Sequence, residues 1–174
     1  MASTYEPIAT TTLNSSQASV TFGSGGTLSQ AYTDLIIIYN AQVNSAAGTH
    51  MTFNGDTGTN YSNTFIYTYL GTPYSSRNSN AYNISNNWVY GESTTANVFT
   101  TSIIQINNYS NQSTYKIALW KFGSTNSVGG NGEVDLICGL WKNTNAITSI
   151  TLTAANTRNY VSGSTFTLYG IKAA

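Results

Sequence analysis

The stretch Tyr32-Thr33-Asp34-Leu35-Ile36-Ile37-Ile38-Tyr39 indicates the fold class of this chain. It consists largely of β-branched and aromatic residues, which fit a pleated sheet best. Its consecutive aliphatic residues leave neither face polar, so we expect this strand to be covered on both faces, or at least to lie near the centre of the core. Strong helix formers are rare elsewhere, and Thr, Tyr, Val, Ile and Phe dominate the apolar stretches. The chain is therefore predicted to be all-β.

Further strands are expected on both sides of this run. Ala18–Phe22 alternates polar and apolar residues, as a half-buried strand does, and it ends at a glycine-rich turn. Thr114–Phe122 and Ile147–Leu152 alternate in the same way. The other expected strands are His50–Asn54, Tyr61–Leu70, Tyr82–Tyr90, Val98–Ile106, Val134–Trp141 and Ser164–Ile171.

Turn and loop segments separate these strands. Gly55–Asn60 permits the positive φ values of a tight reversal, so the strands before and after it are expected to form an antiparallel pair. Gly71–Asn80 and Gly123–Gly132 are expected to be long surface loops. Many strands divided by turn signals are typical of a sandwich or closed barrel. We predict one antiparallel jelly-roll-type β-sandwich domain over residues 15–174, with residues 1–14 as an N-terminal arm or an edge strand.

Charged residues are scarce. They make up 7% of the 174 residues and the formal net charge is +0, whereas roughly 25% is usual. A surface without charge repulsion suits a protein that is packed against neighbours. The six basic residues are scattered, so we exclude nucleic acid as a partner. Without a signal peptide or a membrane-length apolar stretch, we expect synthesis in the host cytoplasm, no secretion and no membrane insertion.

Groups suited to catalysis or metal binding are few. His50 is the single histidine, has no ligating neighbour at suitable spacing, and is interpreted as a strand-end residue. Glu133 and Asp135 would face one side of a strand, but a solvated strand start is favoured over a glycosidase pair. Asn54–Thr59 lacks the periodic carboxylates of a calcium loop. Cys138 lies in an apolar run and is expected to be buried and unreactive. We predict a non-enzymatic protein with no catalytic residue, cofactor or metal site.

Tyrosine is unusually frequent, with 13 tyrosines against six phenylalanines. Tyrosine combines apolar area with a hydroxyl group and little rotamer entropy, so it is enriched at recognition surfaces. We predict that the densest aromatic cluster is an interaction surface for carbohydrate or for subunits, with ordinary sheet decoration as the alternative. The cluster consists of Tyr67, Tyr69, Tyr74, Tyr82, Trp88 and Tyr90.

Three segments resemble a domain that recurs in virion proteins of tailed bacteriophages. They are Phe53–Ser62 (FNGDTGTNYS), Trp141–Leu152 (WKNTNAITSITL) and Gly163–Lys172 (GSTFTLYGIK). In that domain the first segment follows a strand, ITSITL precedes a Gly-Ser turn and LYGIK closes the domain. The resemblance covers roughly residues 30–172. It implies a jelly-roll-like module, commonly trimeric, and no catalytic residues, because the motifs consist of turn and strand residues.

The resemblance leaves two functions open. The first is a capsid decoration (cement) protein, a homo-oligomer, expected to be a trimer, that binds the major capsid protein or other virion proteins and stabilises the outer shell. The absence of a shaft before the domain favours this function. The alternative is the receptor-binding head of a tail fibre, with a host-surface glycan as its partner. An enzyme acting on glycan is the least supported. In either of the first two cases we expect the protein to reside in the virion.

Overall fold

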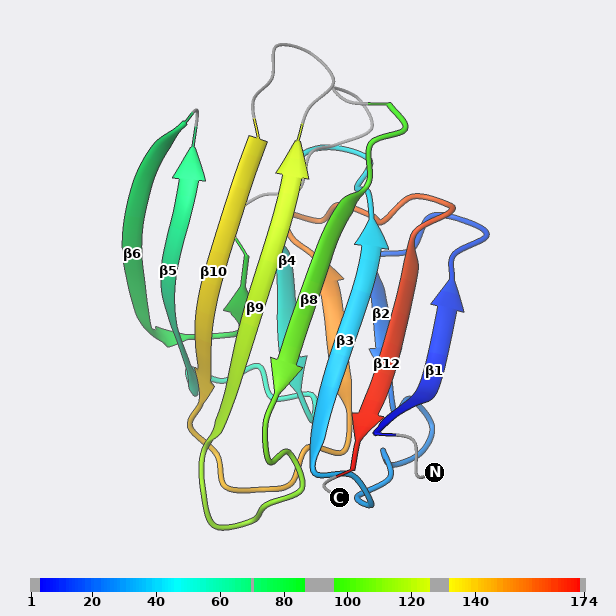
Figure 1. Ribbon diagram of the computed structural model, residues 1–174, viewed down its shortest axis with the longest axis vertical. Coiled ribbons are helices and arrows are strands. Elements are labelled where there is room, and N and C mark those ends of the chain that lie inside the picture. Colours follow the sequence, from blue (N-terminus) through cyan, green and yellow to red (C-terminus); the bar gives the residue numbers. More distant parts are fainter. Residues whose placement is uncertain (1–3, 70, 87–95, 126–131, 173–174) are drawn as a thin grey trace.

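The computed structural model describes residues 4–69, 71–86, 96–125 and 132–172, which form two antiparallel β-sheets without a helix (Figure 1). The larger sheet has eight strands in the order β1 (Tyr5–Thr12), β12 (Thr165–Ile171), β3 (Asp34–Ala41), β8 (Thr100–Ile106), β9 (Lys116–Thr125), β10 (Gly132–Trp141), β5 (Tyr61–Tyr69) and β6 (Thr72–Ala81). The smaller sheet has the order β2 (Ser19–Phe22), β11 (Ile150–Ala154), β4 (Thr49–Phe53) and β7 (Ile84–Ser85). The all-β prediction is confirmed, and the two sheets are consistent with a β-sandwich.

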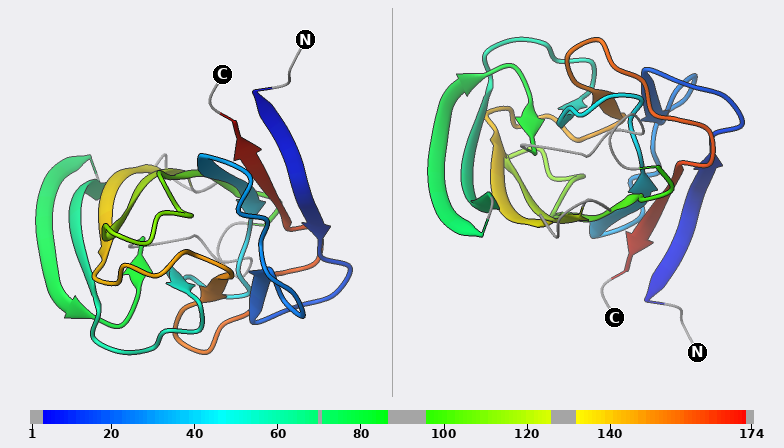
Figure 2. Two further views of the ribbon diagram at one scale, coloured as in Figure 1. Left: turned by 90° about the horizontal axis from the view of Figure 1, so that it is seen from below. Right: turned by 90° about the horizontal axis from the view of Figure 1, so that it is seen from above.

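The hydrophobic core lies between the two sheets, which face each other when the molecule is viewed end-on (Figure 2). Aromatic rings fill much of it. The ring of Tyr39 on β3 stacks on Phe166 of β12 with 5.4 Å between centroids, and meets the edge of Trp120 on β9 at 6.2 Å. Tyr160 packs edge-on against Phe166 at 5.0 Å. Because successive side chains of a strand point to opposite faces, these rings show which alternate residues of β3, β9 and β12 face the core.

The turn at Gly55–Asn60 connects the two sheets instead of closing a hairpin. β4 pairs with β11 and β7 in the smaller sheet, whereas β5 pairs with β10 and β6 in the larger one. The predicted antiparallel pair is therefore wrong. Asn54 and Gly55 do take positive φ values of 53° and 68°. The side chain of Asn54 bonds to the backbone that precedes β11, which holds this end of β4 in the smaller sheet.

The segment predicted as a loop at Gly71–Asn80 is the edge strand β6, paired with β5 over nearly its full length. Almost every residue of β6 is exposed. A strand covered on neither face needs no apolar residue, so its Ser- and Asn-rich sequence lacked a strand pattern. In the predicted strand Tyr82–Tyr90 only Ile84–Ser85 is a strand among the described residues, and residues 87–95 lie outside them. In the predicted loop Gly123–Gly132, β9 continues to Thr125 and residues 126–131 lie outside the description.

The two edges of the larger sheet differ. β1, which falls within the predicted N-terminal segment, pairs with β12 and has a register shift between Pro7 and Ala9. An ion pair between Lys172 and Glu6, 2.9 Å long, joins the end of the chain to this edge. β6 at the opposite edge has an uninterrupted register from Ser62 to Tyr69 of its neighbour.

Candidate functional site

The outer face of the eight-stranded sheet carries aliphatic side chains where a solvated sheet face normally carries polar ones. They lie on β3, β8, β9, β10 and β5, five consecutive strands between β12 and β6 (Figure 1). Their exposed fractions range from 39% to 68%. We define the outer-face patch as Ile38, Ile66, Ile103, Ile117, Leu119, Val134 and Leu136.

The strand register makes the outer-face patch continuous across the sheet. Ile38 of β3 lies opposite Ile103 of β8. Leu136 of β10 lies opposite Ile66 of β5. Lys121 of β9 stands between these two pairs, opposite Ile103 on one side and Leu136 on the other. The four-carbon stem of a lysine is itself apolar. Only the charged end of Lys121 therefore interrupts the apolar row across the sheet.

Cys138 lies on this outer face, and the prediction that it is buried is wrong. Ile137 and Trp141 of β10 point into the core, so the alternation of the strand turns Cys138 outward. It lies opposite Leu119 on β9 and Thr64 on β5. Because the run around it is apolar on both faces, its sequence did not reveal which face would be covered.

The predicted coverage of the central strand on both faces is also wrong for this chain alone. On β3 the inward residues Leu35, Ile37 and Tyr39 are buried, whereas Ile38 on the outer face is exposed. The smaller sheet covers only the inner face of the larger one. The outer-face patch exposes on the order of 600 Å² of apolar surface, at the upper end of the largest patches on soluble monomers. Patches of this size commonly mark interaction sites.

A hollow of about 360 Å³ adjoins one end of the outer-face patch. Ile117 and Leu119 of the patch line it together with Tyr115, which is exposed. Gln105 and Thr114 contribute to the polar part of its rim. The patch is therefore concave at this end. The other end of the patch is formed by Val134 near the start of β10, which is the most exposed member of the patch.

The predicted aromatic cluster is only partly assembled in the described residues. Tyr67 of β5 and Tyr74 of β6 lie opposite each other, with stacked rings 5.4 Å apart. Tyr69 and Tyr74 are about half exposed, and Tyr82 is exposed after the end of β6. The role of the aromatic cluster as an interaction surface stays a prediction. The remaining members, Trp88 and Tyr90, lie outside the described residues.

A groove of about 400 Å³ lies beside Tyr82, where β6 leads into β7. Asn63, buried on β5, donates its Nδ2 to the carbonyl oxygen of Asn83 at 2.9 Å. Its Oδ1 has no hydrogen-bond partner within the described residues. Side-chain amides offer donors and acceptors together, which suits a ligand rich in hydroxyl groups. The groove is lined by Asn63, Arg77, Asn78, Ser79, Asn80, Ala81, Tyr82, Asn83 and Ser85.

Glu133 and Asp135 face the same side of β10, as predicted, but that side is the interior. They are only 4% and 2% exposed, so the prediction of a solvated strand start is wrong. The strand alternation that buries Ile137 and Trp141 also turns both carboxyl groups inward. Burial, and secondly the charge of Asp135, raise the pKa of Glu133 to about 7. The carboxyl group of Glu133 therefore keeps its proton to a higher pH than an exposed glutamate does.

His50 is half-buried on β4, where it pairs with Ser85 of β7 and Thr153 of β11. Burial lowers the pKa of its imidazole. Among the residues that the structure describes, no three His, Cys, Asp or Glu side chains gather at a distance suited to a metal ion. The surroundings of His50 agree with its interpretation as a structural residue of the strand.

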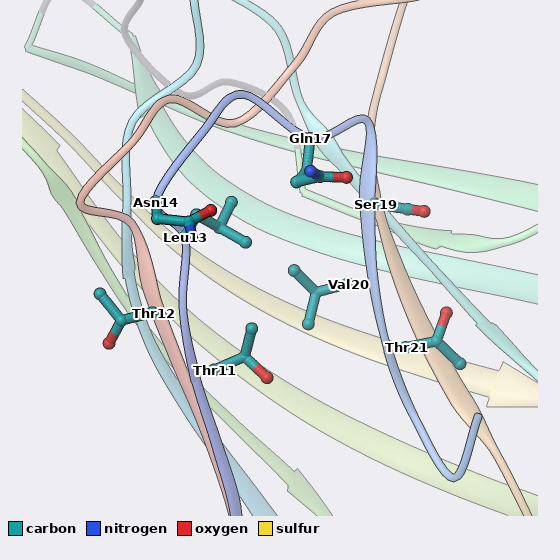
Figure 3. Close-up of a pocket in the computed structure, with 8 residues that line it drawn as sticks. All are labelled: Thr11, Thr12, Leu13, Asn14, Gln17, Ser19, Val20 and Thr21. Carbon is teal, nitrogen blue, oxygen red and sulfur yellow. The ribbon is translucent and has the colours of Figure 1, made fainter. Parts of the chain in front are cut away.

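Another hollow, of about 350 Å³, lies where the end of β1 approaches β2 (Figure 3). Its lining consists of Thr11, Thr12, Leu13, Asn14, Gln17, Ser19, Val20 and Thr21. None of these side chains titrates near neutral pH. The hollow therefore presents hydroxyl and amide groups without an acid, base or charged anchor.

The first two segments of the phage resemblance are bound to each other through Asn54. Its Oδ1 accepts the backbone N–H of Thr148 at 2.7 Å and that of Ser149 at 3.1 Å. Its Nδ2 donates to the carbonyl oxygen of Ala146 at 2.8 Å. One side chain thus replaces a stretch of sheet pairing between the turn after β4 and the backbone before β11. An amide side chain suits this position because it offers an acceptor and donors in one group.

Asp56 makes a second connection between these segments. Its Oδ2 accepts the indole N–H of Trp141 at 2.7 Å and the Nδ2 of Asn60 at 2.9 Å, and its Oδ1 accepts the backbone N–H of Gly58 at 2.9 Å. Burial raises the pKa of Asp56, but these hydrogen bonds outweigh it and hold the pKa below its usual value. The carboxylate is therefore a structural acceptor in a turn.

The third segment contains β12, which pairs with β1 and β3 in the larger sheet. A Cβ atom at Gly170 would lie 2.4 Å from ring atoms of Tyr32, so the ring packs directly on the glycine backbone. Tyr32 donates its hydroxyl to Glu6 at 3.1 Å, and Lys172 bonds the same carboxylate. The hydrogen bond from Lys172 is the main cause that lowers the pKa of Glu6. All three resembling segments therefore have structural roles.

Within the described residues there is no helix of sufficient length and apolarity to cross a membrane. Comparisons with protein-family models, with curated proteins and with solved structures found no match. The outer-face patch was missed from sequence because its residues share their strands with the core. The signal that marks it is the run of aliphatic neighbours, such as Ile36-Ile37-Ile38, Ile103-Ile104 and Leu136-Ile137.

Proposed function

We propose that this protein is a structural component of a tailed-phage virion, namely a capsid decoration protein with a jelly-roll-type fold. The observation that carries the proposal is the outer-face patch, a broad apolar surface on a nearly uncharged protein. The three resembling segments support the virion assignment. The protein acts by adhesion: it assembles as a homo-oligomer and binds the major capsid protein at junctions of the shell.

The apolar surface is large enough to drive such contacts. Removing on the order of 600 Å² from water yields a gross gain of about 15 kcal/mol at 25 cal/mol per Å². Lost rigid-body freedom and side-chain ordering offset about 4 to 15 kcal/mol of that gain. Single contacts are therefore modest, and the repetition of the shell lattice makes the assembled layer stable through avidity.

Capsids assembled without this protein test the proposal. We expect the purified protein to bind them in a copy number that follows the capsid lattice, and to raise the temperature at which the shell ruptures. Ser19→Lys, on the far sheet, is the matched control for changes in the outer-face patch. Binding to host envelopes without any binding to capsids would contradict the decoration function.

The amide-lined groove beside Tyr82 favours a second candidate, a receptor-binding head for host-surface glycan. Asparagine amides and an exposed tyrosine ring offer hydrogen bonds to hydroxyl groups and a stacking surface. Calorimetry with purified host-surface polysaccharide tests this function. Tyr82→Ala should abolish the binding heat, whereas Tyr115→Ala, at another exposed tyrosine, should leave it unchanged.

A further inference from the structure

Strands β3 and β10 of the larger sheet have the sequence pattern of a layer covered on both faces, but the chain covers only one. Ile36-Ile37-Ile38 on β3 and Leu136-Ile137 on β10 present aliphatic groups to both sides. Strands that are covered on both faces read as continuous apolar runs, and strands with one solvated face alternate. β12, in the same sheet, does carry Thr165 and Thr167 outward. Exposed aliphatic side chains are thus concentrated on the strands of the outer-face patch.

We propose that a second copy of this chain covers the outer-face patch, with the two larger sheets stacked face to face about a twofold axis. This inference rests on the proposed function, names the partner of its apolar surface, and gives a twofold pair in place of the trimer expected from sequence. Its first support is size. The patch of about 600 Å² and its polar border approach the roughly 800 Å² per partner that a stable interface buries. Face-to-face sheets pack about 10 Å apart, so both patches would be dry at their centre.

The two ends of the outer-face patch differ in a way that suits a twofold pair. One end is concave, at the hollow formed by Tyr115, Ile117 and Leu119. The other end carries Val134, its most exposed member. In a twofold pair whose strands run in opposite directions, Val134 of each copy lies over the hollow of the other. The same surface then serves both partners, as an isologous interface requires.

The charges on this face are compatible with a second copy. The chain has a formal net charge of +0, so two copies meet without overall repulsion. Lys121 stands within the patch, and Asp34 lies at the start of β3 on the same face. The flexible stem of Lys121 can lie over apolar surface while its ammonium group reaches the wet border. A capsid protein or a glycan on this face is the competing outcome.

Cys138 provides a built-in reporter of this contact, because it is exposed within the patch next to Leu119. We expect its reaction with a thiol reagent to slow by about tenfold or more as the protein is concentrated from about 0.1 µM to about 100 µM, following mass action. Sedimentation should show a monomer becoming a dimer over the same range. A trimer built from this face would also contain a shielded Cys138, but would contradict the twofold stacking.

Two substitutions test the surface itself. Leu119→Lys and Val134→Lys introduce a charge at the hollow and at the opposite end of the patch, and both positions point away from the core. Each should weaken association by about 100-fold or more, because an unpaired charge would be buried, and should keep Cys138 reactive at all concentrations. Ser19→Lys on the far sheet should associate like the unmodified protein. Circular dichroism and the melting temperature verify that the variants are folded.

A monomer at every concentration, with Cys138 always reactive, would overturn this inference. So would an oligomer that Leu119→Lys leaves intact. Capsid binding by a strictly monomeric protein would leave the decoration function standing while this inference fails. A dimer that depends on Leu119 and Val134 but never binds capsids would support this inference and contradict the decoration function.

Discussion

Replacing Asp56 by alanine removes the acceptor that connects the first two resembling segments. The carboxylate accepts hydrogen bonds from Trp141, Gly58 and Asn60 at distances between 2.7 and 2.9 Å. Trp141 is only 1% exposed, so water does not readily replace the lost acceptor. Gly58 and Asn60 lie nearer the surface and are rehydrated more easily. The expected loss of stability therefore comes mainly from the buried indole N–H.

The magnitude follows from these contacts. A buried donor left without a partner costs about 1 to 3 kcal/mol, and a hydrogen bond to a charged group contributes about 1.5 to 3 kcal/mol. We expect Asp56→Ala to lower the free energy of unfolding by about 3 kcal/mol at pH 7. For a chain of this size, that corresponds to a decrease of roughly 6 to 12 °C in the melting temperature.

Urea and thermal unfolding, followed by circular dichroism, measure this loss. Asp56→Asn keeps one carbonyl acceptor and should lose about half as much. The pKa of Asp56 is lower in the folded than in the unfolded chain, where the ordinary value is 3.8. Its contribution is thus present above pH 3.8 and is lost as the pH falls through the folded pKa. A loss below about 0.5 kcal/mol at pH 7, which is usual for a surface substitution, would refute this reasoning.

Two further predictions concern buried groups. The pKa of Glu133 is raised to about 7 from 4.5, so its protonated form stabilises the fold, and stability should fall by up to about 3 kcal/mol as the pH rises from 4.5 to 7. Urea unfolding of Glu133→Gln should lack this pH dependence, and an unchanged dependence would assign it to another group. Gly170→Ala should destabilise by about 1 to 3 kcal/mol because its Cβ would overlap the ring of Tyr32. Gly123→Ala, where the Cβ meets open space, is the control in the same thermal melts, and equal melting temperatures for the two variants would contradict the packing argument.

Alternation was sufficient to predict the strands in which only one face is apolar. β2 is of this kind, with Val20 and Phe22 buried and Ser19 and Thr21 exposed. The range of β9 was predicted as well, but both of its faces carry apolar residues, and Ile117 and Leu119 lie on the exposed one. β6 escaped prediction because an edge strand exposed on both faces needs no apolar residue. Cys138 and Ile38 were assigned to the interior because their neighbours in sequence are apolar on both sides. Which face the second sheet covers depends on contacts between distant strands.

The resembling segments were identified from sequence, but their physical role was not. Asn54 and Thr148 are 94 residues apart, and only the fold brings them to hydrogen-bonding distance. The same holds for Asp56 and Trp141, which are 85 residues apart. The buried pair Glu133 and Asp135 was expected in solvent because a glycine-rich segment precedes it. Register with the neighbouring strands, which local composition does not encode, turned both side chains inward.

The central claim is that the outer face of the eight-stranded sheet binds other protein in the virion. A reconstruction of the virion that resolves this chain tests the claim most directly. The account predicts density for the chain on the capsid shell, with Ile103, Leu119 and Leu136 buried against another protein chain. Density in which these three side chains face solvent, or a chain absent from the shell, would contradict it.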